Sequence, residues 1–311
     1  MDITDLQMEK LNTPEVTVGV ITYNSSRTVL QTLESIKAQT YDKIRLIISD
    51  DCSTDDTVNV CKQWIAGNSS RFVSADIVTA SANTGVAGNC NRAWDACQSD
   101  FFKAIAGDDY LLPDCIENNV SFMLDNPSSV VVFSKVIFVG RKREIKRCRN
   151  LFDYSFFNLS VSEQHKWLVE VTNCIPASTS FYRMQRIRDL GIRFDERVPF
   201  LEDWPMWIML TERGIRLDFL DKETVCYKVG GISAIGRVMS ISFFRSTLKF
   251  DLYYRFESAY NQDKESAIDA FTERQALLYH DIARKMKKTP EYRVGRFILA
   301  PWRFFKNLFS R

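Results

Sequence analysis

The sequence has no Cys-x-x-Cys pair among its eight cysteines and only two histidines, His165 and His280. This scarcity of clustered ligands argues against a zinc site. No stretch of eighteen residues is apolar and free of charge, and the polar residues 1–13 lack the hydrophobic region of a signal peptide. Glycine and proline are also few, 12 and 8 in 311 residues, which excludes fibrous and low-complexity classes. We therefore expect a globular protein of the cytoplasm with reduced cysteines.

Neither sign of charge is in large excess, because 41 lysine and arginine residues stand against 39 aspartate and glutamate residues. The net charge of +2 argues against nucleic acid as a partner, since nucleic-acid-binding domains are usually strongly basic. The hydrophobic content of 45% in a chain of this length is enough for a large core without disulfides.

Apolar runs alternate with polar loops along the first 140 residues. Runs of strand length occupy residues 16–22, 44–49, 75–79, 101–106 and 130–139. Helical spacing follows the first three runs, over residues 29–39, 57–66 and 90–99. This succession predicts an α/β fold, Rossmann-like and doubly wound around a mainly parallel sheet. In such sheets the ligand crevice lies at the carboxyl ends of the strands.

The pattern is less regular after residue 140. Residues 141–149 carry six basic side chains against one acidic, which indicates a linker or an exposed loop. Further helices are expected over residues 165–171 and 202–213, and further strands over residues 174–182, 215–220 and 224–229. From residue 242 onward the spacing is almost entirely helical, which predicts a helical C-terminal extension.

Three acidic pairs lie where strands end or a helix begins: Asp50–Asp51, Asp108–Asp109 and Glu202–Asp203. Two adjacent carboxylates that face one crevice are costly unless a cation shares them. An aspartate shortly before a helix also serves as an N-cap, so for Asp108–Asp109 the residues alone leave cation binding and capping open. For Asp203, two residues before Pro205, the alternatives are a helix cap and a general base.

Five motifs in order carry a resemblance to a known family. They are Thr22-Tyr23-Asn24, residues 50–57 (DDCSTDDT), Asn83-Thr84-Gly85, Gly107-Asp108-Asp109 with Pro113, and Glu202-Asp203-Trp204. Over residues 14–235 the sequence therefore resembles a family 2 glycosyltransferase of the GT-A fold, of the bacterial kind that builds cell-surface polysaccharides.

The resemblance implies that the first three motifs bind a nucleotide-sugar donor, with a UDP-sugar expected. Thr22 and Tyr23 would pack on the nucleotide base. Asp51 would accept a hydrogen bond from uracil. Asn83 and Gly85 would line the nucleoside pocket.

The resemblance also implies a metal site and a catalytic base. Asp109 would be the direct ligand of Mn²⁺ or Mg²⁺, with Asp108 near the ribose and the metal, and Asp203 would take the proton from an acceptor hydroxyl. The sequence departs from the family at Ala106, where many members carry a further aspartate, and after Lys228, where many carry a histidine. For Lys228 the alternatives are a contact to the donor diphosphate and a solvated side chain.

These roles predict an inverting, metal-dependent hexosyltransferase that acts on a glycan or a polyprenyl-diphosphate-linked acceptor. Residues 14–140 would form the nucleotide-sugar-binding half of the GT-A domain, residues 141–235 its acceptor-binding half, and residues 236–311 a helical, basic and amphipathic extension. The alternative is a catalytically silent nucleotide-sugar-binding or scaffold subunit of a polysaccharide assembly complex, in which the acidic pairs are helix caps.

The last thirty-one residues carry nine basic side chains against two acidic ones, interleaved with large aromatic and aliphatic residues. This composition is typical of a helix that lies on an anionic membrane surface. The alternatives are a helix that packs on the catalytic domain and one that packs on a second copy in a homo-oligomer. Membrane docking would make the protein peripheral on the inner face of the plasma membrane.

Overall fold

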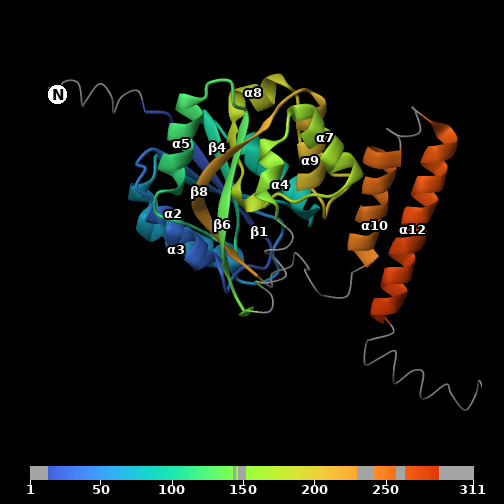
Figure 1. The fold of residues 1–311 in the computed structure, drawn as a ribbon. Coiled ribbons are helices and arrows are strands. Elements are labelled where there is room, and N and C mark those ends of the chain that lie inside the picture. Colours follow the sequence, from blue (N-terminus) through green and yellow to red (C-terminus); the bar gives the residue numbers. More distant parts are fainter. Residues whose placement is uncertain (1–12, 143–144, 146–151, 230–240, 257–262, 287–311) are drawn as a thin grey trace, which may run out of the picture. The chain divides into compact units, whose positions relative to one another are not determined.

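The computed structural model describes residues 13–142, 145, 152–229, 241–256 and 263–286. The chain forms two compact units, residues 1–235 and residues 236–311. In the first unit, helices cover a central sheet, as Figure 1 shows. The division of this unit into a donor half and an acceptor half stays a prediction.

The first half of the sheet alternates strands and helices. Its elements are β1 (Val16–Thr22), α2 (Val29–Lys37), β2 (Ile44–Asp50), α3 (Thr57–Asn68), β3 (Ser74–Thr79), α4 (Gly85–Ala96) and β4 (Phe101–Ala106), with a 3-10 turn, η1 (Ser69–Arg71), before β3. All four strands are parallel, in the order β3-β2-β1-β4. In register, Thr22 lies beside Asp50, and Ile21 beside Ala106. The carboxyl ends of these strands therefore coincide, so the loops that follow them share one edge.

The second half of the sheet is mixed. Its elements are β5 (Tyr110–Leu111), α5 (Cys115–Asp125), β6 (Val131–Val139), η2 (Tyr154–Asn158), α7 (Val161–Glu170), η3 (Ala177–Thr179), β7 (Phe181–Arg183), α8 (Met184–Asp189), α9 (Asp203–Glu212) and β8 (Leu217–Lys228). The full order is β3-β2-β1-β4-β7-β6-β8-β5. Strand β7 is antiparallel to β4 and β6, and β6 is parallel to β8. The predicted α/β fold with a mainly parallel sheet is confirmed.

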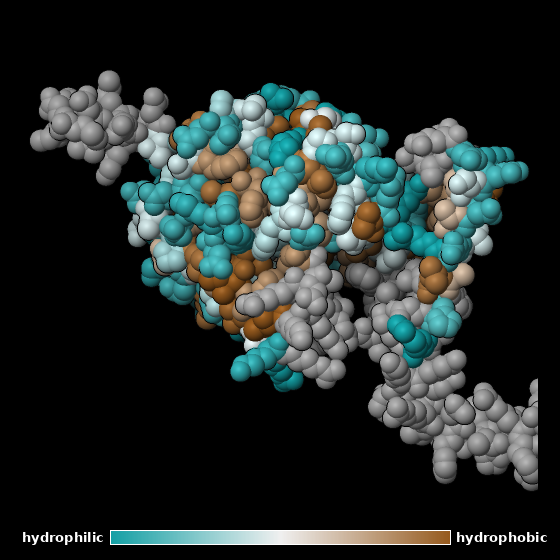
Figure 2. Space-filling view, viewed as in Figure 1, coloured by the Kyte–Doolittle hydropathy of each residue, from teal (hydrophilic) through white to brown (hydrophobic). Residues whose placement is uncertain are grey.

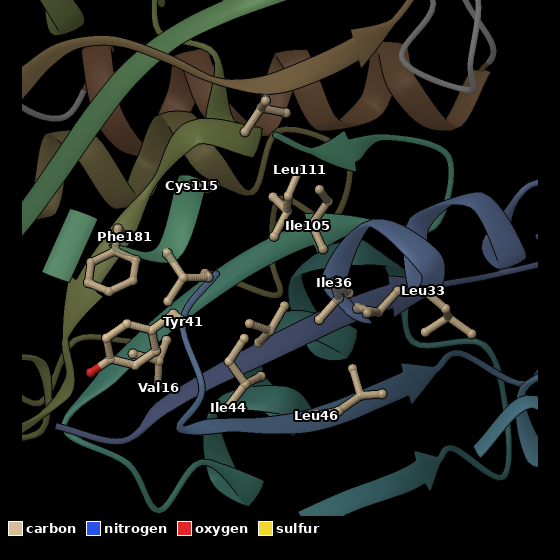
Figure 3. Close-up of a cluster of buried hydrophobic side chains, with 14 of the residues drawn as sticks. Val16, Leu33, Ile36, Tyr41, Ile44, Leu46, Ile105, Leu111, Cys115 and Phe181 are labelled. Carbon is tan, nitrogen blue, oxygen red and sulfur yellow. The ribbon is translucent and has the colours of Figure 1, made fainter. Parts of the chain in front are cut away.

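The core forms because every second residue of β1 and β2 is apolar and α2 presents an apolar stripe to that face. Val16 and Ile44 are fully buried on the strands, and Leu33 and Ile36 are fully buried on α2. Figure 3 shows these side chains gathered with Leu111 and others between the strands and the helix. Each such side chain contributes about 1.5–3 kcal/mol through its burial. This packing holds the strand ends in fixed positions.

The segment 174–182 differs from the predicted strand. Only Phe181–Arg183 is extended, and Ala177–Thr179 forms a 3-10 turn. The hydroxyl of Thr179 donates to the carbonyl of Pro176 at 2.8 Å, and the hydroxyl of Ser180 donates to the carbonyl of Ala177 at 2.8 Å. These short polar side chains compete with strand pairing for the backbone, so the small-residue run turns instead of extending.

Two further expectations about element bounds are wrong. The expected strands 215–220 and 224–229 are one strand, β8, whose register against β6 shifts beside Lys135, as at a β-bulge. At this register shift, Lys135 of β6 forms a salt bridge with Asp221 of β8. Helix α4 begins at Gly85 instead of residue 90, because the Asn-x-Gly turn leads directly into it.

The second unit contains α10 (Ile241–Phe250), the π-helix η4 (Asp251–Phe256) and α12 (Lys264–Met286). The buried carboxylate of Asp251 accepts from Arg255 at 2.9 Å and pairs with Arg274 of α12 at 3.1 Å. Among the described residues, no helix combines the length and apolar character that crossing a membrane requires. The predicted membrane-docking tail falls on residues 281–311, most of which lie outside the described residues.

Exposed apolar side chains of the first unit are spread over several elements. Figure 2 shows a face on which hydrophilic side chains predominate and apolar ones form small groups. Leu30 and Leu124 are exposed on α2 and α5. Tyr23, Val86 and Phe200 are also more than a third exposed, and each of them belongs to a segment beside the strand ends or the start of α9.

Candidate active site

The loops after β1 and β2 are bound to each other. Asn24 and Cys52 have the positive φ angles 51° and 63°, a conformation that is uncommon for residues other than glycine. The side-chain oxygen of Asn24 accepts from the backbone N–H of Thr54 at 2.8 Å, and the backbone N–H of Asn24 donates to the hydroxyl of Ser53 at 2.8 Å. These bonds hold both turns at the sheet edge.

Asp50 links the same two loops from inside. Its carboxylate accepts from the hydroxyl of Thr22 at 2.9 Å and from the backbone N–H and hydroxyl of Ser53 at 2.8 and 2.6 Å. Thr22 and Asp50 are each 1% exposed. Asp50 is therefore a structural acceptor for the loops around it.

Asp51 organises the turn after β3. Its carboxylate accepts from the backbone N–H groups of Thr84 and Gly85 at 3.0 and 2.8 Å, and from the hydroxyl of Thr84 at 2.6 Å. Nη2 of Arg92, in α4, lies 3.4 Å from Oδ1 of Asp51. The side-chain amide of Asn83 donates to the Asp51 carbonyl at 3.3 Å. The structure thus brings Asp51, Asn83 and Gly85 together, beside Thr22, whose carbonyl accepts from the Asp51 N–H.

Two glycines allow the loops to approach closely. Gly85 has a φ of 83°, and a β-carbon there would lie 2.9 Å from Cβ of Pro199, in the loop before α9. A β-carbon on Gly107, after β4, would lie 3.0 Å from the methyl group of Thr22. The loops after β1, β2, β3 and β4 and the loop before α9 therefore form one connected group.

Asp108 and Asp109 do not cap a helix. The N-cap of α5 is Asp114, and strand β5 separates it from the acidic pair. Asp109 is 4% exposed, and its Oδ1 accepts from the backbone N–H of Lys228 at 2.8 Å. Burial raises the pKa of Asp109 to about 7 in spite of that bond, and the charge of Asp108 adds to the rise. Burial also raises the pKa of Asp108, while the nearby charge of Lys228 lowers it.

A buried lysine lies behind this pair. Lys103 of β4 is fully buried, and its ammonium donates to the carbonyl groups of Ser178 and Ser180. Burial lowers the pKa of Lys103 to about 8, and the charge of Asp109 opposes that fall. In return, the Lys103 charge favours the ionised form of Asp109.

The donor set at Asp108–Asp109 fits a hard divalent cation. Mg²⁺ and Mn²⁺ prefer carboxylate oxygens, and a buried carboxylate with a raised pKa gains from a positive charge beside it. Within the described residues, no group of three or more His, Cys, Asp or Glu side chains is placed to hold a metal. A cation held here by two carboxylates would take its other ligands from water and substrate oxygens.

Asp203 is the first residue of α9, one position after the N-cap. The N-cap residue is Glu202, and it makes no side-chain capping bond. Asp203 Oδ2 accepts from the side-chain amide of Asn173 at 2.7 Å, and Oδ1 accepts from the backbone N–H of Trp204 at 2.9 Å. Burial raises the pKa values of both Glu202 and Asp203, and for Glu202 the charge of Asp203 adds to the rise.

The Glu202–Asp203 pair lies near the loop cluster through Cys90 of α4. Burial raises the pKa of the Cys90 thiol, and the charges of Glu202, Asp203 and Asp51 raise it further. Asp51 follows β2 and the Glu202–Asp203 pair lies at the start of α9, so two segments far apart in the chain act on the same thiol. The candidate base therefore lies near the candidate nucleotide loops.

Sequence reasoning missed three polar residues of this region. Lys103 was detectable in principle, because it is a charged residue inside an apolar strand run. Arg92 and Asn173 carry no local signal, since their partners Asp51 and Asp203 lie 41 and 30 residues away.

The fold and the acidic loops at its strand ends define a class, the glycosyltransferases of the GT-A fold. The family model described as glycosyl transferase family 2 matches residues 17–188. This is more than half of the chain, and the protein belongs to that family.

Relatives and solved structures agree with this assignment. EpsE of Bacillus subtilis, which is named as a glycosyltransferase, is 33% identical over 204 residues, covering 65% of this chain and 69% of EpsE. The Escherichia coli protein WfaP, named as a UDP-Glc:alpha-D-GlcNAc-diphosphoundecaprenol beta-1,3-glucosyltransferase, is 24% identical over 70% of this chain and 80% of its own. The structure of S. aureus TarS 1–349 with UDP-GlcNAc has a TM-score of 0.60 at 19% identity, covering 90% of this chain and 77% of that chain.

Proposed function

We propose that the protein is an inverting glycosyltransferase of cell-surface polysaccharide synthesis. It transfers a sugar from a UDP-sugar to a hydroxyl group of a glycan or of a polyprenyl-diphosphate-linked acceptor. The observation that carries the proposal is the close approach of the loop before α9 to the turn after β3, where a β-carbon on Gly85 would lie 2.9 Å from Cβ of Pro199. The name of WfaP, with its UDP-glucose donor and diphosphoundecaprenol acceptor, supports this choice of substrates.

The donor nucleotide is proposed to bind across the loops after β1, β2 and β3. Tyr23 is 38% exposed and offers a ring on which the base stacks, next to the buried Thr22. Asp51 accepts from the uracil N3–H. Asn83 and Gly85, fixed on Asp51 by hydrogen bonds, line the nucleoside pocket.

The donor diphosphate is proposed to lie at Asp108–Asp109. Asp109 would hold Mn²⁺ or Mg²⁺ there, and a bound divalent cation neutralises the charge of the leaving diphosphate. Lys228 supports the same placement, because its charge acts on Asp108 while its backbone N–H binds Asp109. Of the two readings of Lys228, these contacts favour a diphosphate contact.

Asp203 is proposed as the general base. It accepts two hydrogen bonds that favour its ionised form, whereas the charge of Asp203 disfavours ionisation of Glu202. Asp203 takes the proton of the acceptor hydroxyl as that oxygen attacks the anomeric carbon from the face opposite the diphosphate. One base and a well-positioned donor are enough for this inversion.

The proposal is tested on the purified full-length chain. Thermal shift with UDP, GDP and CDP, with and without Mn²⁺, should show stabilisation by UDP that metal increases; ligand at about 100 times its Kd adds roughly 2.7 kcal/mol. UDP release from UDP-Glc and UDP-GlcNAc then measures turnover. Asp109→Asn and Asp203→Asn should each lower it by about 10² to 10⁴-fold, and the exposed Asp125→Asn should not.

Two outcomes would contradict the proposal. Nucleotide binding without any turnover, or no nucleotide binding at all, would favour the silent scaffold subunit. Full turnover by Asp203→Asn would remove this residue as the base. NMR of the first-formed product distinguishes inversion from retention at the anomeric carbon.

Membrane docking by the basic tail is a separate proposal. Its support is the charge and aromatic content of residues 281–311. Each basic side chain near an anionic surface contributes about 1 kcal/mol. Sedimentation of the full chain with anionic but not neutral liposomes, weakened by salt, is expected; equal sedimentation with both would contradict it.

A further inference from the structure

The segment between α7 and η3 supplies a side chain to the Asp203 carboxylate. Nδ2 of Asn173 donates to Oδ2 of Asp203 at 2.7 Å. The backbone N–H of Trp204 donates to Oδ1 of the same carboxylate at 2.9 Å. Because one donor acts on each oxygen, the two bonds together fix the orientation of the carboxylate.

The Asn173 side chain is itself held in one orientation. Its Oδ1 accepts from the backbone N–H of Ile175 at 3.1 Å. An asparagine amide has one acceptor end and one donor end, so this bond turns the donor end toward Asp203. Asn173 can therefore act on Asp203 only as a hydrogen-bond donor.

The packing of α7 against α9 sets the distance between these two residues. The indole N–H of Trp204, at the start of α9, donates to the carbonyl of Leu168 in α7 at 2.8 Å. Farther along, Nδ1 of His165 lies 3.1 Å from the hydroxyl of Thr211. Asn173 follows the end of α7 by three residues, so the packing of α7 on α9 places the Asn173 amide beside the Asp203 carboxylate.

We propose that Asn173 is the positioning residue of the general base: its amide holds Asp203 in one orientation and favours the ionised carboxylate. Asn173 takes up no proton itself. The inference rests on the proposed role of Asp203 and adds a residue on which its proton affinity depends.

The hydrogen bond from Asn173 opposes the effect of burial on the ionisation of Asp203. Burial raises the pKa of Asp203, and the Asn173 bond is the largest of the effects that lower it. Burial keeps Cys90 and Tyr182 neutral by raising their pKa values, and Lys166 faces Glu170 in an exposed pair. The titratable groups that respond to the charge of Asp203 are Glu202 beside it, Cys90 of α4 and Tyr182 of β7. The surrounding elements also carry Arg92 and Asp95 on α4, Glu163, His165, Lys166 and Glu170 on α7, and Asp195, Glu196 and Arg197 in the preceding loop.

The test compares two substitutions at residue 173 in the full-length chain. Asn173→Ala removes the donor. Asn173→Asp keeps an acceptor for the Ile175 N–H but places a negative oxygen toward Asp203. Asn126→Ala is the matched control, because the Asn126 amide donates to the carbonyl of Phe122 in α5.

The readout is the pH dependence of kcat/KM for hydrolysis of UDP-Glc and UDP-GlcNAc with Mn²⁺, beside the Kd of UDP. For Asn173→Ala we expect the acidic limb of the profile to move to a pH about one unit higher. At pH values on this limb, kcat/KM is then about tenfold lower than in the wild type. Asn173→Asp should move the limb further, because a like charge opposes ionisation. The Kd of UDP should stay within about twofold, and Asn126→Ala should leave the profile unchanged.

Two results would overturn the inference, and they are distinguishable. If Asp203→Asn is inactive but both Asn173 variants keep the wild-type limb, or lose activity equally at every pH, Asn173 has only a structural role. If Asp203→Asn turns over as the wild type does, Asp203 is not the base, and the inference fails together with that assignment.

Discussion

Replacing Asp51 by asparagine tests whether the nucleotide loops are built around this carboxylate. Oδ2 of Asp51 accepts from the N–H groups of Thr84 and Gly85, at 3.0 and 2.8 Å. An asparagine retains only one acceptor oxygen, so either these two N–H groups or the donors on Oδ1, the Thr84 hydroxyl and Arg92, would face an NH₂ group. The residue is 2% exposed, and water has little access to replace the lost acceptor.

The expected cost follows from the number of bonds lost. A buried N–H without an acceptor costs about 1–3 kcal/mol, and a hydrogen bond to a charged group is worth about 1.5–3 kcal/mol against about 1 kcal/mol for a neutral one. The pair with Arg92 is 3.4 Å long and partly exposed, so after screening it adds less than about 1 kcal/mol. We expect Asp51→Asn to lower the free energy of unfolding by about 3 kcal/mol.

Urea unfolding of the nucleotide-free chain, followed by tryptophan fluorescence, measures this loss. Asp56→Asn is the matched control in the same loop, because Asp56 is exposed and its Oδ1 accepts from the side chain of Asn59 at 2.9 Å. It should change the free energy of unfolding by less than about 0.5 kcal/mol. A change that small for Asp51→Asn would refute the structural role of the carboxylate.

The same variant tests the proposed contact with uracil. Position N3 of uracil is a hydrogen-bond donor, whereas N3 of cytosine is an acceptor. If the Asp51 carboxylate accepts from uracil N3–H, Asp51→Asn should reduce the preference for UDP over CDP, measured as the ratio of their Kd values. A lower stability with an unchanged ratio would leave Asp51 with the structural role alone.

Three further predictions concern the glycine turn and the acidic pair after β4. Gly85→Ala should lower the free energy of unfolding by about 1–3 kcal/mol, because its β-carbon would lie 2.9 Å from Pro199 at a φ of 83°. Gly67→Ala is the control in the same urea assay, since a β-carbon there has no atom within 4 Å. Equal free energies of unfolding for the two variants would contradict the prediction. Burial raises the pKa of Asp109 to about 7, above its unfolded value, so its contribution to stability is present at low pH and is lost as pH rises through about 7. We expect stability to fall by about 4 kcal/mol between about pH 4 and about pH 8, and Asp109→Asn to flatten that slope in urea titrations; a parallel slope in the variant would be evidence against it. Lys103→Met removes a charge that lowers the pKa of Asp109, so calorimetry should show Mn²⁺-dependent UDP binding displaced to higher pH, and an unmoved midpoint would show that Lys103 does not act on the pair.

Local sequence was sufficient for the parallel half of the sheet. The runs at residues 16–22, 44–49 and 101–106 are confirmed as β1, β2 and β4 to within a residue, because buried parallel strands are rich in apolar and β-branched residues. The start of α9 and its end just before Gly214, which has a φ of 74°, were also predictable from proline and glycine chemistry. These features depend only on neighbouring residues.

The segments around the second half of the sheet were less predictable because their structure depends on distant partners. Residues 174–182 have strand-like composition but turn through local hydroxyl bonds. Asn173 lies just before them in a segment without a motif, and its importance appears only when α7 docks on α9. No periodicity or spacing records such a contact.

The three acidic pairs look alike in the sequence but differ in the number of donors around them. The pair Asp50–Asp51 is surrounded by hydroxyl and N–H donors from three loops, so its negative charge is used to hold the fold. The pairs Asp108–Asp109 and Glu202–Asp203 accept few bonds for their burial, and their pKa values rise as a result. A carboxylate with unmet charge gains from a cation or a proton, whereas one already satisfied does not. This difference favours the latter two pairs for the proposed metal binding and proton transfer, and the donors around Asp50–Asp51 include residues far away in the chain.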